Sequence, residues 1–250
     1  MTTDETPFRD RDPILASDAL HALNGGELEI VGRMMWSSNS TYLVNIGGAA
    51  DGLQAIYKPQ KGERPLWDFP SGLHLREVAS YKLAKRIGWD IVPPTVLRDG
   101  PFGIGSLQLF IPCDFDVHYF HILEETTHHL ALQKICLFDY VANSTDRKGG
   151  HCLLGSHGNI WAIDNGLTFH VEFKLRTVIW DWAGVEIPKQ LLDDLRGFTR
   201  GFTANPLSSD FDDLLSKAEQ SAMLKRAEEL LSFGVFPSDH SGTRYPWPII

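Results

Sequence analysis

The sequence predicts an α+β protein of two lobes, with a β-rich first half, a helical second half and a cleft between them. Two observations lead to this fold class. Short runs of β-branched and apolar residues dominate the first half, at positions 27–31, 41–46, 53–57 and 105–111. The second half carries longer stretches with helical spacing, at positions 130–143, 191–198 and 211–231. Strands grouped before helices are typical of α+β organisation.

The first half reads as a small sheet with one helix. A polar run at positions 37–41 separates the first two strands, which predicts a hairpin. The third strand ends at Pro59, because proline has no N–H to donate to a ladder. Residues 76–88 have helical spacing, and Gly88 suits the position after the last helical turn.

The second half is organised around a buried helix. Residues 130–143 are apolar almost all round, as expected for a central helix. Two short apolar runs, 151–154 and 160–163, follow it and predict a second hairpin. The apolar tail at 244–250 is expected to pack back on the helical lobe. The predicted organisation is a disordered N-terminal arm over residues 1–17, an N-lobe over 18–112 and a C-lobe over 113–250.

Composition narrows the class of protein. The 250 residues are 43% hydrophobic, enough for a substantial core. No run approaches the roughly 20 apolar residues of a membrane span, and the polar, acidic N-terminus does not resemble a signal peptide. Three widely spaced cysteines form no metal or disulfide pattern, so a cytoplasmic location is expected. The net charge of -9 predicts no nucleic-acid partner and no strong membrane binding.

A strand lysine and a helix glutamate form the first part of a candidate site. Lys58 ends the third strand and is expected to point into the cleft. Glu77 shares a helical stripe with Tyr81 and Ala84, so it faces the interior. Because a buried carboxylate needs a cationic partner, we expect Glu77 to pair with Lys58.

Three further polar groups are expected to converge in the second half. Asp146 lies in the polar loop after the buried helix, where functional residues often occur. The second hairpin brings His151, at the start of one strand, close to Asp164, at the end of the other. An isolated Asp-Asn-Gly is ordinarily a turn, but convergence with the Asp146 loop favours a functional site. A cation, metal ligands and a group that orients a nucleophile are what phosphoryl transfer requires.

The same residues resemble a known group. The runs 55–59 (AIYKP), 76–81 (REVASY), 143–147 (NSTDR) and 163–166 (IDNG) are similar to the phosphatidylinositol 3-/4-kinase-like proteins, including small actinobacterial and HipA-related members. The resemblance covers residues 26–195. It implies a two-lobed protein-kinase-like fold that binds ATP with Mg2+ or Mn2+ in the cleft.

The resemblance also implies roles for individual residues. Asp146 corresponds to the catalytic aspartate and Asp164 to the principal magnesium ligand. Lys58 corresponds to the lysine that holds phosphate, supported by Glu77. The hinge strand, which holds adenine in the group, corresponds here to Gln108, Phe110 and Ile111.

Two departures from the group affect the metal and the phosphates. The second metal position is asparagine in the relatives but His151 here, and imidazole suits Mn2+ better than Mg2+. If His151 is a ligand, metal affinity should fall as pH drops through about 6.5. Asn143 is an alternative oxygen donor. The phosphate loop, with Ser38, Asn39 and Ser40, has no glycine, so its hydroxyls and N–H groups would bind phosphate, or it is a simple hairpin turn.

The function expected from these features is an ATP-dependent phosphotransferase, a kinase that acts on a hydroxyl of a protein or small molecule. Two alternatives stay open: a nucleotide-binding regulatory module without catalysis, and an enzyme that transfers AMP. A phosphoinositide acceptor is less favoured, because the acidic chain has no polybasic segment.

Overall fold

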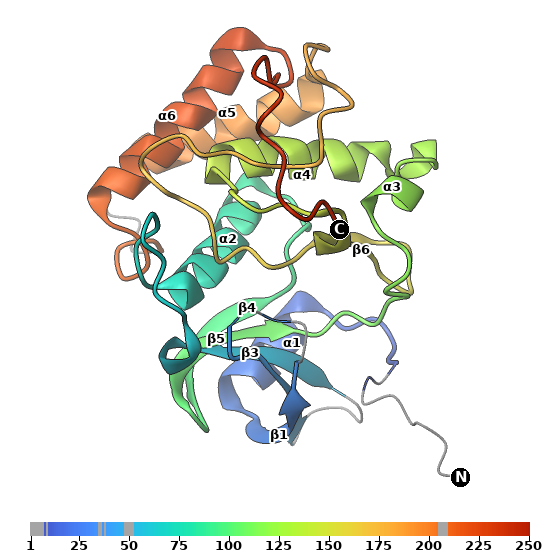
Figure 1. Ribbon diagram of the computed structural model, residues 1–250, viewed down its shortest axis with the longest axis vertical. Coiled ribbons are helices and arrows are strands. Elements are labelled where there is room, and N and C mark those ends of the chain that lie inside the picture. The colour runs from blue at the N-terminus through green and yellow to red at the C-terminus, as the bar shows by residue number, and fades with distance from the viewer. Residues whose placement is uncertain (1–7, 9, 35–36, 38, 48–52, 205–209) are drawn as a thin grey trace.

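The computed structural model describes residues 8, 10–34, 37, 39–47, 53–204 and 210–250 (Figure 1). Of the arm predicted over residues 1–17, residues 1–7 and 9 lie outside the described residues. Helix α1 (Ala16–Gly25) begins within the last two residues of this arm, and the sequence pattern did not predict this helix. Its first residue is preceded by Leu15, which has no side-chain oxygen to cap a helix, so the usual start signal is missing.

The first half forms one antiparallel sheet of five strands in the order β1-β2-β3-β5-β4. The 37–41 segment joins the first two strands, as the predicted hairpin requires. Pro59 is the last residue of its strand and lies opposite Gly105 on β5. The strands are β1 (Glu27–Arg33), β2 (Tyr42–Gly47), β3 (Gln54–Pro59), β4 (Thr95–Gly100) and β5 (Gly103–Leu109).

The second half is mainly helical, with one short hairpin. Figure 1 shows this helical part at the opposite end of the molecule from the five-stranded sheet, with α2 (Leu73–Ile87) between them. The predicted α+β architecture is confirmed. The remaining elements are η1 (Gln60–Gly62), α3 (Tyr119–Ile122), η2 (Thr126–His128), α4 (His129–Ala142), η3 (Gly149–His151), β6 (Cys152–Leu154), β7 (Ile160–Ala162), α5 (Lys189–Ala204) and α6 (Lys217–Phe233).

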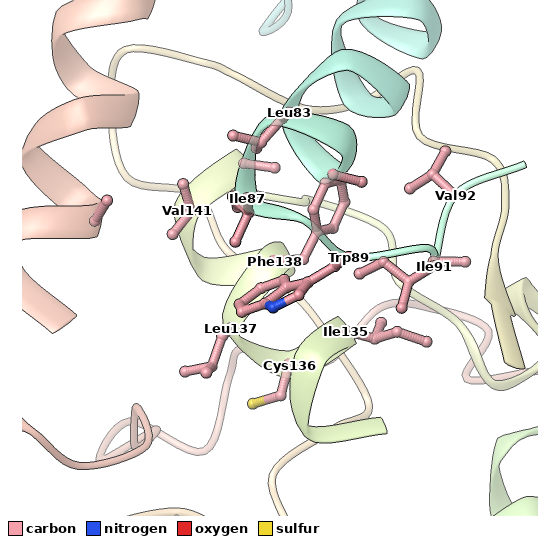
Figure 2. Close-up of a cluster of buried hydrophobic side chains, with 14 of the residues drawn as sticks. Leu83, Ile87, Trp89, Ile91, Val92, Ile135, Cys136, Leu137, Phe138 and Val141 are labelled. Carbon is pink, nitrogen blue, oxygen red and sulfur yellow. The ribbon is translucent and has the colours of Figure 1, made fainter. Parts of the chain in front are cut away.

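The larger core surrounds α4 and the end of α2. Figure 2 shows Leu83, Ile87 and Trp89 facing Phe138 and Val141, with the Trp89 indole lying across the cluster. Trp89 is fully buried, and its indole N–H, the one polar group of the side chain, donates to Asp194 at 2.8 Å. The predicted central buried helix is thus confirmed as α4. Its rigid core supports the loop that carries Asp146.

Helix α2 is fastened to both halves, which fixes the walls of the cleft. Its buried Arg76 pairs with Glu219 of α6. At its start, the Glu63 carboxylate accepts the backbone N–H groups of Gly72 and His74 at 3.0 and 2.7 Å. A carboxylate at this position satisfies donors that would otherwise have no partner and complements the helix dipole. Glu77 is carried into the cleft by this fixed helix.

Candidate active site

A cleft of about 620 Å³ lies between the sheet and the helical half. Its apolar part is lined from both sides, by Ile56 and Leu109 of the sheet and by Leu153 and Ile163 of the second hairpin. Its polar part holds every group that the sequence singled out for chemistry: Lys58, Glu77, Asp146, His151 and Asp164. An apolar pocket with a few convergent polar groups is the usual form of a small-molecule site.

Lys58 is the central cation of this cleft. Its ammonium contacts Oε1 of Glu77, as expected, and lies 2.7 Å from Oδ1 of Asp164. Burial acts to lower the pKa of Lys58, but the Asp164 and Glu77 carboxylates outweigh it and raise the pKa above its usual value. The lysine is therefore charged and bridges the two halves of the protein.

Asp164 lies at the end of the second hairpin and has a left-handed backbone, with φ 55°. This conformation is uncommon for residues other than glycine and is found at functional sites. The ion pair with Lys58 lowers the pKa of Asp164 well below its usual range, against the effect of burial. Half of the side chain is exposed, so an ionised carboxylate faces the open cleft.

The Nε2 nitrogen of His151 faces Asp164. The hairpin register brings the two together, because the Ile163 N–H donates to the His151 carbonyl at 3.0 Å. Nε2 of the imidazole lies 3.5 Å from Oδ2 of Asp164. The predicted proximity of these two residues is confirmed.

The hydrogen bonds of His151 select its tautomer. Nδ1 lies 2.9 Å from the carbonyl oxygen of Asp146, which can only accept, so Nδ1 carries the proton. The Lys148 N–H, 3.4 Å from the same nitrogen, is then too distant to compete. Burial lowers the pKa of His151 to about 4, and the ring is neutral at pH 7. The lone pair of Nε2 therefore faces an ionised carboxylate, an arrangement that a cation between them would satisfy.

This pKa corrects one expectation. A window of acid sensitivity near pH 6.5 assumes an ordinary histidine. Because burial lowers the pKa of His151 to about 4, the ring stays neutral at pH 6.5 and could still donate its lone pair. Any loss of metal binding caused by protonation of His151 belongs near pH 4.

Asp146 lies in the loop before His151 and also lines the cleft. Burial raises the pKa of its carboxyl group, and the nearby Asp164 charge adds to this effect, while Lys148 opposes it. The Lys148 ammonium lies 3.4 Å from Oδ2 of Asp146. A carboxylate with a raised pKa is better suited to accept a proton than an ordinary aspartate.

Arg147 fixes the Asp146 loop to the Asp164 loop, and the sequence did not predict this role. Its guanidinium is fully buried and contacts Asp139 of α4 at 3.0 and 3.1 Å. It also donates to the Ile163 carbonyl at 2.6 Å and to the Asn165 side chain at 2.5 Å. The signal in the sequence was Asp139, a carboxylate within an otherwise apolar helix that needs a cationic partner.

Asn143 is not an oxygen donor for metal, contrary to the alternative considered from the sequence. Its amide nitrogen donates to the carbonyls of His170 and Glu172, and its amide oxygen accepts the Lys174 N–H at 2.8 Å. These three bonds hold the segment that follows the Asp164 loop. The side chain is therefore committed to structure.

The phosphate loop lines the cleft through Ser37, Asn39 and Ser40, whereas Ser38 lies outside the described residues. Several of its polar groups are already used, among them the Ser37 hydroxyl, which is bonded to the Thr41 hydroxyl at 2.8 Å. The Ser40 N–H donates to the Gly62 carbonyl at 3.1 Å, and Asn39 accepts the Arg64 N–H at 2.9 Å. The expectation that the loop cradles phosphate through its backbone N–H groups is wrong for Ser40, because its N–H already has an acceptor.

The predicted hinge residues line the opposite end of the cleft. The Gln108 amide is bound to Thr95 at 2.9 Å, and the Phe110 N–H donates to the Gln54 carbonyl at 3.0 Å. Within the described residues, the Ile111 N–H has no protein acceptor. Ile111 is thus the hinge residue that can donate to a purine ring, while Gln108 and Phe110 shape the wall.

The described residues contain no group of three or more His, Cys, Asp or Glu side chains arranged to hold a metal ion by themselves. Asp164 and His151 nevertheless supply two donors that face each other. Mg2+ and Mn2+ in nucleotide sites take few protein ligands and complete their shell with phosphate oxygens and water. The pair fits a metal that is held jointly with ATP.

Among the described helices, none is both long and apolar enough to cross a bilayer.

Comparison with known proteins places this geometry in context. No family model matches the chain. The chain is 37% identical over 268 residues to Protein Rv2133c of Mycobacterium tuberculosis, covering 94% of this chain and 96% of that protein.

Two solved structures are similar in fold. The Golgi casein kinase aligns over 87% of this chain and 75% of its own, with a TM-score of 0.53 and 15% identity. The Helicobacter pylori proinflammatory kinase CtkA aligns over 86% of this chain and 94% of its own, with a TM-score of 0.52 and 11% identity. The predicted two-lobed kinase-like fold is confirmed. The narrower resemblance to phosphatidylinositol 3-/4-kinase-like and HipA-type proteins stays a prediction.

Proposed function

We propose that this chain, which belongs to the same family as Protein Rv2133c of Mycobacterium tuberculosis, is an ATP-dependent phosphotransferase. The observation that carries this proposal is the Lys58 ammonium, which joins Glu77 of α2 to Asp164 of the second hairpin inside a kinase-like cleft. A strand lysine paired with a helix glutamate is the kinase arrangement for holding nucleotide phosphates.

The proposal assigns a role to each of the polar groups described above. The apolar end receives the purine, with the Ile111 N–H as its hydrogen-bond donor. Lys58 neutralises phosphate charge and is kept in place by Glu77. Asp164 and His151 hold Mg2+ or Mn2+, which when bound would offset charge on the phosphoryl group that is transferred. Asp146 orients the acceptor hydroxyl and takes its proton.

The acceptor is proposed to be a hydroxyl of a protein or small molecule. One structural neighbour is the Golgi casein kinase, which makes a protein hydroxyl the first acceptor to test. The net charge of -9 disfavours a phosphoinositide in an anionic bilayer. We expect no sedimentation with phosphoinositide vesicles at physiological salt, and strong sedimentation would reverse this preference.

The direct test follows γ-phosphate transfer from labelled ATP to a panel of protein and small-molecule acceptors, with Mg2+ or Mn2+. Asp146→Asn should lower turnover by about 100-fold or more while the thermal shift with nucleotide is retained. Asp213→Asn, on the exposed surface before α6, is the matched control and should leave transfer unchanged. Unchanged transfer by Asp146→Asn would remove Asp146 from the mechanism.

The alternative of a nucleotide-binding module without catalysis is favoured by one observation. The donor that faces Asp164 is the imidazole of His151, where an oxygen donor would suit Mg2+ better. Nucleotide-dependent stabilisation with neither transfer nor hydrolysis across the acceptor panel would support this alternative. Transfer of AMP instead of phosphate would be recognised by the mass added to the acceptor.

A further inference from the structure

A distant segment of the chain touches the loop that carries Asp146. The Gly149 N–H donates a 2.7 Å hydrogen bond to the carbonyl oxygen of Ile249. Gly149 is the first residue and His151 the last residue of η3, the turn that follows Asp146. Figure 1 shows the segment before the C-terminus descending past α4 and ending beside β6.

The Ile249 carbonyl supplies a partner that the turn itself lacks. The first N–H groups of a helical turn have no acceptor within the turn. Gly149 is buried, and a buried N–H without an acceptor is destabilising. On the same side, the ring of Phe120 packs against Gly149. The turn is therefore held against Phe120 and Ile249.

The segment is fastened at a second point of the same network. The Arg244 carbonyl accepts the Thr177 N–H at 3.1 Å, and the Arg244 guanidinium lies over the Phe173 ring at 4.7 Å. The Thr177 hydroxyl donates to Asp139, the carboxylate that also holds Arg147. The segment thus reaches the loop both directly and through the buried ion pair beneath it.

Pro246 is buried, but side-chain burial does not explain why the residues after it lie here. Trp247 is 89% exposed and Ile250 is 57% exposed, so neither contributes much to the core. The contact with the turn is made by the backbone of Ile249. A segment that holds a loop by a main-chain hydrogen bond, while its large side chains stay in solvent, is suited to positioning that loop.

We propose that residues 244–250 are a positioning element for the proposed phosphotransferase: by binding Gly149, the Ile249 carbonyl holds η3 so that Asp146 and His151 keep their places in the cleft. The inference rests on the proposed function. His151 bonds to the Asp146 carbonyl across this turn, so a shift of Gly149 moves both groups together. Misplacement of catalytic groups by about 1 Å can cost on the order of 100-fold in rate.

Two adjacent glycines provide a matched pair of variants. A Cβ atom on Gly149 would lie 3.3 Å from both the Ile249 oxygen and the Phe120 ring, so Gly149→Ala pushes the turn away from its support. A Cβ atom on Gly150 would meet nothing within 4 Å, so Gly150→Ala is the control in the same turn. A third variant ends the chain after Pro246 and removes the Ile249 carbonyl.

Two measurements separate the contact from its role in turnover. Hydrogen exchange of peptides that cover residues 147–153 reports the Gly149 bond without any need for activity. The shortened chain should exchange this amide at least about 10-fold faster, because its acceptor is gone. Phosphate transfer should show kcat reduced about 10- to 100-fold in Gly149→Ala and the shortened chain, with ATP affinity unchanged.

The outcomes distinguish the two proposals. Faster exchange together with a selective loss of kcat, absent in Gly150→Ala, supports the positioning role. Unchanged exchange in the shortened chain, or a kcat equal to that of the wild type, overturns it even if the protein is a kinase. A full-length protein that transfers no phosphate at all refutes the proposed function, and with it the catalytic part of this inference, whatever the exchange result.

Discussion

The backbone N–H of Asn165 donates a 3.0 Å hydrogen bond to Oε2 of Glu77. The other carboxylate oxygen of Glu77 contacts Lys58, so one buried side chain connects Lys58 to the loop of Asp164. Helix α2 therefore sets the distance between two parts of the site that are far apart in the sequence.

Substitutions of Glu77 should separate these two contacts. Glu77→Gln keeps an acceptor for Asn165 but loses the charge opposite Lys58, so ATP affinity should fall about 10-fold with little loss of stability. Glu77→Ala leaves the buried Asn165 N–H without its acceptor and leaves Lys58 with Asp164 alone, so it should also lower the free energy of unfolding by about 1–3 kcal/mol. Nucleotide titration and urea denaturation measure the two effects. Equal behaviour of the two variants would contradict this division of roles.

The buried pair of Arg147 and Asp139 should dominate the stability of the loop. Asp139→Ala removes the carboxylate that holds a fully buried guanidinium and should cost about 3–5 kcal/mol. Asp213→Ala, on the surface, should stay within about 0.5 kcal/mol of the wild type. Denaturant unfolding monitored by tryptophan fluorescence provides both values. A loss below about 1 kcal/mol in Asp139→Ala would mean that the pair is not held as described.

The pKa of His151 predicts a pH dependence of stability in the absence of metal. Burial lowers this pKa to about 4, while the unfolded chain takes up the proton near the ordinary value of 6.5. As pH falls from 6.5 to about 4, protons bind the unfolded state first and the folded state loses stability. The loss should be about 2–3 kcal/mol, at 1.36 kcal/mol for each pKa unit.

The measurement is urea denaturation in a chelator at several pH values. His151→Asn should flatten the slope over this window relative to the wild type. His240→Asn, at an exposed position, is the control and should keep the wild-type slope. If both variants follow the wild type, burial of a neutral His151 is not what makes stability depend on pH.

The choice of metal should also depend on His151. With an imidazole donor, Mn2+ should support nucleotide binding better than Mg2+, in line with ligand preference. His151→Asn supplies an oxygen instead and should shift the ratio of affinities toward Mg2+. Thermal shifts with ATP and each metal give this ratio. The same ratio in both proteins would show that His151 does not bind the metal.

Local patterns predicted much of the site. The spacing of a strand lysine and an inward-facing helix glutamate was enough to pair Lys58 with Glu77, and the hairpin pattern placed His151 beside Asp164. These predictions succeeded because strand and helix periodicity decide which side chains share a face. Such predictions are limited to contacts between one helix or strand and the next element along the chain.

The contacts missed by the sequence are long-range ones. Nothing in the periodicity around Gly149 indicates that Ile249 is its acceptor, because that contact is set by how the whole helical half packs. Helix α1 was missed because it begins without a capping side chain. The ordinary acid window expected for His151 was wrong because desolvation depends on the surrounding tertiary structure.

The three hydrogen bonds of Asn143 have a consequence for control of the protein. In kinases whose loops are ordered by phosphorylation, the added phosphate meets free arginines and supplies the energy of ordering. Here the segment containing His170, Glu172 and Lys174 is already held by one asparagine, and the guanidinium of Arg147 is occupied. Because these bonds already order the segment, a phosphate added to it would have no disordered state to convert, and we expect phosphorylation there to leave the conformation of the segment unchanged.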